Sequence, residues 1–124
     1  MSEALQGVVV CHAKLARALI EAAESISGVT GALTPVSNAD CDRGSLEQRV
    51  LEAVDGRPTV VFVDMASGSC LFAVLNRLRT APGVKVVTGV NLAMLVDFVF
   101  HRSLSPDEAA ARAATAGERA IRVP

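Results

Sequence analysis

The sequence predicts an α/β fold built around a parallel sheet, and two observations carry that prediction. Short runs rich in β-branched residues alternate with longer segments of helical periodicity along the 124 residues. The run at 59–63 (Thr-Val-Val-Phe-Val) is almost entirely apolar, which is typical of a strand buried on both faces of a parallel sheet. Strands that alternate with helices are connected by right-handed crossovers. No linker, repeat or low-complexity segment interrupts the pattern, so we expect one domain over residues 1–124.

The expected strands share β-branched or apolar composition and lie at 7–11, 32–36, 59–63 and 84–87. The expected helices follow them, over 14–27, from 45 to about 56, from the loop at 67–69 through 78, over 92–101 and from 105 to about 117. The tail at 121–123 (Ile-Arg-Val) is a candidate for a short final strand.

In the first helix, Leu15, Leu19, Ala22 and Ile26 recur at steps of four, three and four, which predicts that they form its buried face. Gly28 follows directly and suits the left-handed position that ends many helices.

Two further helices have recognisable beginnings. Ser45 with Gln48 three residues later resembles a capping box, in which each side chain bonds a free N–H of the first turn. Ser105, Pro106 and Glu108 combine a capping hydroxyl, a proline at the first helical position and an acid three residues after the cap. We therefore expect helices to begin at both places.

Composition excludes several classes of function. The net charge of -1, with 20% charged residues, provides no basic surface for nucleic acid. The apolar runs are too short to cross a bilayer, and the first seven residues lack the pattern of a signal peptide. Three widely spaced cysteines fit neither a disulfide framework nor a zinc-binding pattern. We expect a cytoplasmic protein without direct membrane insertion and without a metal or cofactor.

Side chains with chemical potential follow the predicted strands. His12 comes directly after the first strand, and Asp64 after the third, with Ser67, Gly68 and Ser69 just beyond it. In open α/β sheets, ligands bind outside the carboxyl ends of the strands, so these residues should converge at one edge. An imidazole, a carboxylate and a loop of small residues are suited to carrying a phosphoryl group on histidine.

Each of these side chains has a definable role. A neutral imidazole nitrogen of His12 can attack phosphorus. Asp64 can accept a hydrogen bond from the other ring nitrogen, which fixes the tautomer and supports the cation formed on attack. Backbone N–H groups around Ser67, Gly68 and Ser69 can hold phosphate oxygens.

Plainer interpretations stand beside these. A single histidine at a strand end is often a structural or surface residue, an aspartate there is often a cap, and Ser-Gly-Ser is an ordinary loop composition. Cys11 neighbours His12 but points to the opposite face of a strand, so we expect it in the core. His101 should interact with the carbonyl groups at the end of its helix.

Two segments resemble a known family. The sequence from 61 to 96 (Val-Phe-Val-Asp-Met-Ala-Ser-Gly-Ser-Cys, then Val-Val-Thr-Gly-Val-Asn-Leu-Ala-Met-Leu-Val) is similar to the IIA domains of mannose-family sugar phosphotransferase systems. The start, Val-Val-Val-Cys-His-Ala-Lys-Leu-Ala, resembles their first strand and phosphorylated histidine. The Gly-Val-Asn-Leu-Ala-Met-Leu segment at 89–95 is the most specific part, and the resemblance covers nearly the whole chain.

The resemblance implies a doubly wound sheet in the order 2-1-3-4 and a homodimer, often with a C-terminal edge strand exchanged between subunits, here 121–123. It implies that His12 accepts phosphate from an HPr-like phosphocarrier and passes it to a IIB protein, which we expect to be a separate chain. Asp64 would orient the histidine, and Ser69 would lie beside the phosphate on Nε2.

Three short segments depart from the family pattern. Ala13 replaces a glycine that usually follows the histidine, the loop is Ser-Gly-Ser-Cys where Gly-Gly-Ser-Pro is common, and Ala93 replaces a proline. None removes a group that must take or hold phosphate. Because of these departures, three other functions also stay open. The chain could be a regulatory module whose binding depends on phosphorylation, a phosphodonor domain like that of dihydroxyacetone kinase, or a fold that transfers no phosphate. The segment at 89–95 favours the mannose type over the dihydroxyacetone relatives.

Overall fold

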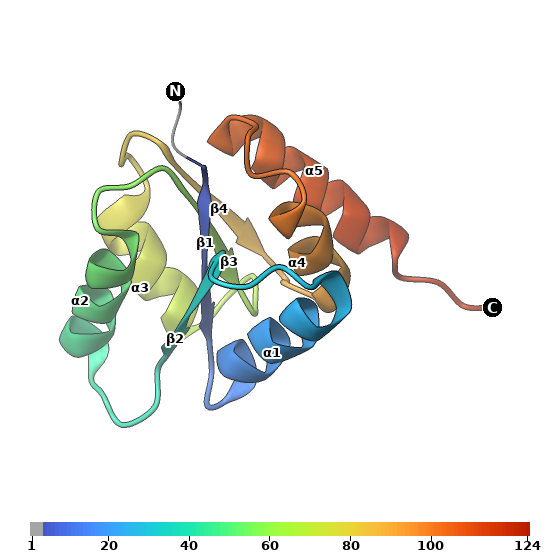
Figure 1. Cartoon of the computed structure of the whole chain (residues 1–124). Helices are drawn as coiled ribbons and strands as arrows, with labels where there is room; N and C mark the ends of the chain where they lie inside the picture. Colours follow the sequence, from blue (N-terminus) through green and yellow to red (C-terminus); the bar gives the residue numbers. More distant parts are fainter. Residues whose placement is uncertain (1–3) are drawn as a thin grey trace.

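A four-stranded parallel sheet forms the centre of the computed structural model, which describes residues 4–124 (Figure 1). Its strands are β1 (Gln6–Cys11), β2 (Leu33–Ser37), β3 (Thr59–Val63) and β4 (Val84–Thr88). The helices between and after them are α1 (Leu15–Ser27), α2 (Arg43–Val54), α3 (Ser69–Leu78), α4 (Leu92–Val99) and α5 (Pro106–Arg119). Among the described residues, no helix is long and apolar enough to cross a membrane.

The strand order is β2-β1-β3-β4, which confirms the predicted doubly wound topology. β1 lies between β2 and β3, and its register places Val10 beside Val63 of β3 and Cys11 beside Ser37 of β2. All six residues of β1 are buried. The order reverses between β1 and β3, so the loops after these two strands diverge to opposite faces and leave a crevice at their carboxyl ends.

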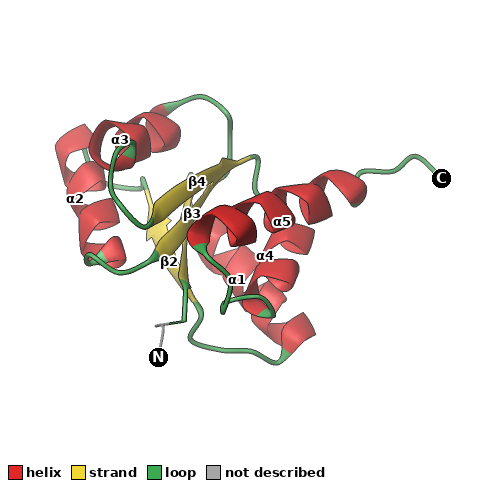
Figure 2. Ribbon diagram, turned by 90° about the horizontal axis from the view of Figure 1, so that it is seen from above, coloured by secondary structure: helices red, strands yellow, loops and turns green. Residues whose placement is uncertain are grey.

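Helices cover both faces of the sheet (Figure 2). α1, α4 and α5 pack on one face, and α2 and α3 pack on the other. Each face has its own buried apolar cluster. Alternate residues of the central strands contribute to the two clusters, as the period of two in a strand requires: Val9 and Cys11 to one, Val8 and Val10 to the other. Burial of Cys11 in this core is as predicted.

The buried face of α1 differs from the prediction. Its buried residues are Ala16, Ile20 and Ala23. Of the four residues predicted, Leu19 and Ala22 are half-buried, whereas Leu15 is 44% exposed and Ile26 is 61% exposed. The helix is apolar on more than one side, so two neighbouring stripes satisfy the same periodicity. The small alanine side chains face the sheet because they permit close packing. Gly28 does adopt the left-handed conformation expected of the helix end, with φ at 74°.

The beginning of α2 also differs from the prediction. The cap is Asp42, whose Oδ1 accepts a hydrogen bond from the backbone N–H of Ser45 at 2.8 Å, and Gln48 instead donates to Glu52. The cap thus lies three residues earlier than expected. Hydrogen bonds from Ser45, the backbone one first, lower the pKa of the Asp42 carboxyl. A carboxylate at this position also interacts favourably with the helix dipole.

The predicted start of α5 is confirmed. Ser105 Oγ accepts from the N–H of Glu108 at 3.2 Å and donates to its carboxylate at 2.9 Å. Beyond the end of α5, residues 121–124 form no regular secondary structure, and Ile121 and Val123 are 77% and 98% exposed. No strand forms there within this chain, so strand exchange with a second chain stays a prediction.

Phe98 of α4 anchors the core on the α1 side. Its ring is fully buried, lies edge-on to Phe62 with 5.3 Å between centroids, and packs over Gly7, where a Cβ would lie 2.9 Å from it. We expect Phe98→Ala to lower the free energy of unfolding by about 3–5 kcal/mol. In urea unfolding, the control Phe100→Ala should change stability far less, because Phe100 is 58% exposed. Equal losses in both variants would contradict this assignment of the core.

Candidate functional site

His12 lies in the turn that ends β1 and leads into α1. The next residue, Ala13, has a left-handed φ of 52°, which explains why glycine suits this position. Two residues at the carboxyl end of β2 hold the turn: Asn38 Oδ1 accepts from the N–H of Ala13 at 3.0 Å, and Ser37 Oγ donates to the carbonyl of Ala13 at 2.6 Å. Sequence reasoning missed Ser37 and Asn38, because the apolar pattern of β2 is too weak to mark its carboxyl end.

Asp64, directly after β3, holds His12 in two ways. Its Oδ2 accepts from the backbone N–H of His12 at 2.8 Å and lies 2.7 Å from the ring Nδ1. A carboxylate only accepts hydrogen bonds, so Nδ1 carries the hydrogen and Nε2 keeps its lone pair. The side chain of Asp64 is only 8% exposed, whereas that of His12 is 41% exposed. The predicted pair is thus brought together, with the acceptor buried and the imidazole accessible.

The loop after β3 brings the beginning of α3 to the imidazole. Gly68 has a φ of 97°, and a Cβ there would lie 3.8 Å from His12 Cε1, so the loop passes close to the ring. Ser69, the first residue of α3, places Oγ 3.5 Å from Nε2. Ser67 is exposed and lines the groove along α3. Of the three loop residues predicted, Gly68 and Ser69 lie at the imidazole.

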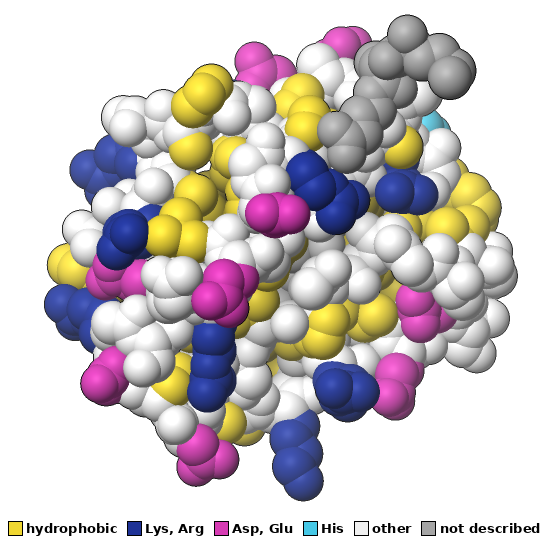
Figure 3. Space-filling model, turned by 60° about the vertical axis from the view of Figure 1, so that its left-hand side comes forward, with side chains coloured by type: hydrophobic (Ala, Val, Ile, Leu, Met, Phe, Trp, Pro, Cys, Tyr) yellow, Lys and Arg dark blue, Asp and Glu magenta, His cyan; other side chains and the backbone are white. Residues whose placement is uncertain are grey.

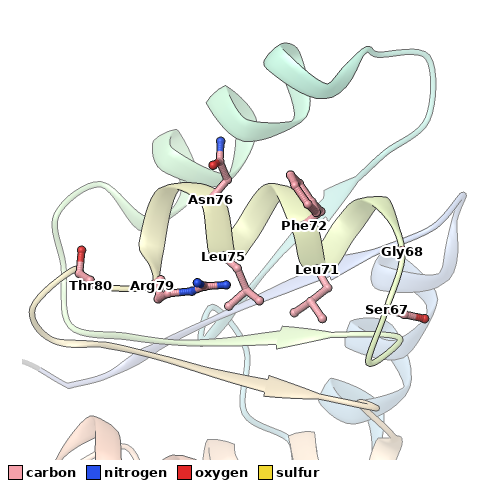
Figure 4. A pocket seen from close by; sticks show the side chains of 8 residues that line it. All are labelled: Ser67, Gly68, Leu71, Phe72, Leu75, Asn76, Arg79 and Thr80. Atoms are coloured by element: carbon pink, nitrogen blue, oxygen red, sulfur yellow. The ribbon is translucent and has the colours of Figure 1, made fainter.

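A groove of about 540 Å³ runs from this loop along α3 (Figure 4). It is lined by Ser67, Gly68, Leu71, Phe72, Leu75, Asn76, Arg79 and Thr80. The guanidinium of Arg43 stacks over the ring of Phe72 at 4.3 Å from the centroid. On the face seen in Figure 3, basic and acidic side chains are interspersed, so the described residues form no field of a single sign there.

Cys70 is a site residue that sequence reasoning missed. Its Sγ lies 3.7 Å from His12 Nδ1, and the residue is fully buried. Burial first, and then the charge of Asp64, raise the pKa of the Cys70 thiol to about 11. Burial likewise raises the pKa of Cys11 to about 12, so both thiols stay protonated at neutral pH. A separation of 58 residues hides the contact of Cys70 with His12 from any local motif.

The second histidine has a structural role, as predicted. His101 Nδ1 lies 2.7 Å from the carbonyl oxygen of Asp97, in the turn that follows α4. The same carbonyl accepts the backbone N–H of Phe100 at 3.2 Å, so His101 adds a second hydrogen bond at the end of the helix.

Comparison with known proteins identifies the family. The family model described as "PTS system fructose IIA component" matches residues 6–115. A search of curated proteins finds no match. The fold is similar to the mannose/sorbose-specific IIA subunit of the phosphotransferase system from Enterococcus faecalis, with a TM-score of 0.84 and 21% identity over 98% of this chain and 96% of that one.

Two other solved structures are similar. The phosphotransferase system component EIIA from Streptococcus agalactiae gives a TM-score of 0.85 and 20% identity, covering 96% of both chains. A sigma-54 interaction domain protein from Enterococcus faecalis gives 0.78 and 14%, covering 98% of this chain and 96% of that one. These likenesses show the fold, and the family model covers most of the chain. The chain therefore belongs to the fructose/mannose-type IIA components of the phosphotransferase system.

Proposed function

We propose that His12 carries a phosphoryl group, which it accepts from the phosphohistidine of an HPr-like carrier and passes to a IIB protein. One observation carries the proposal. The 2.7 Å contact between Asp64 Oδ2 and His12 Nδ1 leaves the lone pair on Nε2, the nitrogen beside Ser69. Nε2 is then the nucleophile, and it lies at the accessible side of the pair.

The transfer requires little besides positioning and charge stabilisation. The Nε2 lone pair forms a bond to phosphorus while the bond from phosphorus to the carrier's imidazole nitrogen breaks, and the carrier's imidazole leaves with that electron pair. The His12 ring gains positive charge as the new bond forms. The buried Asp64 carboxylate, hydrogen-bonded to Nδ1, stabilises that charge. Attack by the IIB nucleophile on the same phosphorus returns the ring to its neutral form.

The beginning of α3 is suited to holding the phosphoryl oxygens. The first N–H groups of a helix lack partners within it, and the helix dipole favours negative charge there. Ser69 begins the helix with its hydroxyl facing Nε2, and Gly68 lets the backbone approach the ring. We assign Ser67, Gly68 and Ser69 to the phosphate site, Ser67 at its outer edge.

A regulatory role stays the second candidate. The sigma-54 interaction domain protein shares the fold at 14% identity, so this fold also occurs in a protein named for interaction with a sigma factor. A phosphate on His12 would change the charge of an exposed surface, which can switch the affinity for a partner. In both roles the chemistry at His12 is the same, and only the acceptor differs. The family match argues against the dihydroxyacetone kinase alternative.

Labelling with the natural carriers tests the proposal. The chain is incubated with phosphoenolpyruvate, enzyme I and the HPr of the source organism, and then with the IIB protein of that organism. We expect one phosphate per chain that is labile to acid and stable to base, followed by its loss to IIB. Labelled protein that never transfers to IIB would favour the regulatory role. Failure to label with several HPr proteins would contradict both roles.

A further inference from the structure

Three potential metal ligands meet at His12. The ligating atoms of His12, Asp64 and Cys70 all lie within 4.8 Å of one another. They come from three separate segments: the end of β1, the end of β3 and the first turn of α3. An imidazole nitrogen, a carboxylate oxygen and a thiolate sulfur are the ligand types that Zn²⁺ takes in proteins.

The spacing of these atoms is close to that of a tetrahedral zinc site. Zinc bond lengths place a nitrogen and a sulfur ligand about 3.6 Å apart, and a nitrogen and an oxygen ligand about 3.4 Å apart. The observed distance from His12 Nδ1 to Cys70 Sγ is 3.7 Å, and that from Nδ1 to Asp64 Oδ2 is 2.7 Å. Of these two distances, only that from Nδ1 to Oδ2 has to lengthen, because the metal would replace the hydrogen that now bridges those atoms.

An unpartnered oxygen at the same place also points to a ligand. Asp64 Oδ1 is buried and has no hydrogen-bond partner among the described residues, in a side chain only 8% exposed. A buried acceptor without a partner is costly and rare in native structures. A cation that binds both carboxylate oxygens of Asp64 would supply that partner. The accessible His12 ring forms the outer side of the cluster, where a cation can enter.

We propose that His12, Asp64 and Cys70 bind Zn²⁺, and that bound zinc prevents phosphorylation of His12. The second part rests on the proposed function. Zinc takes the Nδ1 lone pair and a thiolate, so the Cys70 proton passes to solvent and the Nδ1 proton reappears on Nε2. A protonated Nε2 has no lone pair for phosphorus. Metal ligation and phosphoryl acceptance at one neutral imidazole therefore exclude each other.

Cobalt binding tests the site without any phosphoryl transfer. Co²⁺ is titrated into the purified chain, and the thiolate-to-cobalt charge-transfer band in the near ultraviolet reports ligation by sulfur. We expect this band in the wild type and its displacement by Zn²⁺. Cys70→Ser should abolish the band and weaken Co²⁺ binding by roughly tenfold or more. The matched control is Cys41→Ser, since Cys41 is a half-buried thiol bonded to the carbonyl of Asn38.

Two outcomes of the titration would overturn the site. One is a wild type without the band, and the other is a band that survives in Cys70→Ser or disappears in Cys41→Ser. Cys70→Ala serves as a second variant if the serine side chain disturbs the fold.

Inhibition of His12 phosphorylation by zinc is tested separately. For each variant, the phosphorylation rate with Zn²⁺ is divided by the rate of the same variant without Zn²⁺. At a free Zn²⁺ concentration ten times the wild-type Kd, the phosphorylation rates of the wild type and of Cys41→Ser should fall about tenfold, because about nine-tenths of the sites are filled. The rate for Cys70→Ser should fall by no more than about twofold, because a Kd at least tenfold weaker leaves half of its sites or fewer filled, and this variant also controls for effects of zinc on the carriers. Cobalt binding with an unchanged wild-type rate would reject the inhibition but keep the site. A chain that binds cobalt but never accepts phosphate would contradict the proposed function alone.

Discussion

Replacing His12 with glutamine should abolish phosphoryl acceptance, with the loss limited only by the detection of label. Glutamine has about the size of histidine, but its amide nitrogen has no available lone pair, so nothing replaces Nε2 as nucleophile. Because the His12 side chain is 41% exposed, the substitution should leave the fold intact. The measurement is labelling from phosphoenolpyruvate through enzyme I and HPr, with thermal unfolding as the check on folding.

The matched control is His101→Gln. His101 also pairs through Nδ1, but with the carbonyl of Asp97 in the last turn of α4, and it lies outside the proposed site. We expect this variant to be labelled at the wild-type rate. Acid-labile label that persists in His12→Gln, or that disappears in His101→Gln, would refute the assignment of His12.

The substitution Asp64→Asn should slow phosphoryl transfer by on the order of 10²- to 10⁴-fold. Asparagine keeps the shape of the side chain but removes the charge that supports the imidazolium. It also introduces an amide N–H₂ group, which can face Nδ1 and reverse the tautomer. Rapid-quench measurement of transfer from phospho-HPr gives the rate. As a control, Asp107→Asn removes an exposed carboxylate that pairs with Lys85 on the surface. An unchanged rate in Asp64→Asn would rule out an orienting role.

Much of the fold followed from local signals that tertiary packing reinforces. The apolar run of β3 and the Ser105 start of α5 were correctly predicted, because burial on two faces and capping hydrogen bonds each leave a pattern within a few residues. The buried face of α1 was not, since apolar residues extend beyond the stripe that packs on the sheet, and Leu15 and Ile26 are exposed. Which apolar side chains are buried is decided by packing against the sheet and the neighbouring helices, and this packing leaves no local pattern in the sequence.

Part of the candidate site was predicted from the sequence, and part was not. The rule that ligands bind at the carboxyl ends of parallel strands predicted the meeting of His12 and Asp64, which the hydrogen bonds confirm. Cys70 was predicted neither as a ligand nor as a neighbour of the imidazole. The position of Cys70 depends on the direction in which the first turn of α3 leaves the loop. That direction is set by packing in the apolar cluster on the face of the sheet that α2 and α3 cover.

The register of β1 against β3 has a consequence for how the site comes into being. Asp64 is 52 residues from His12, so their contact exists only after β1 and β3 have paired. That pairing closes a long segment of chain that contains α1, β2 and α2. A nascent or partly refolded chain displays the imidazole without the carboxylate that orients it. Competence to accept phosphate should therefore appear together with the whole sheet during refolding. Labelling at His12 would then report native folding as well as the supply of phosphate.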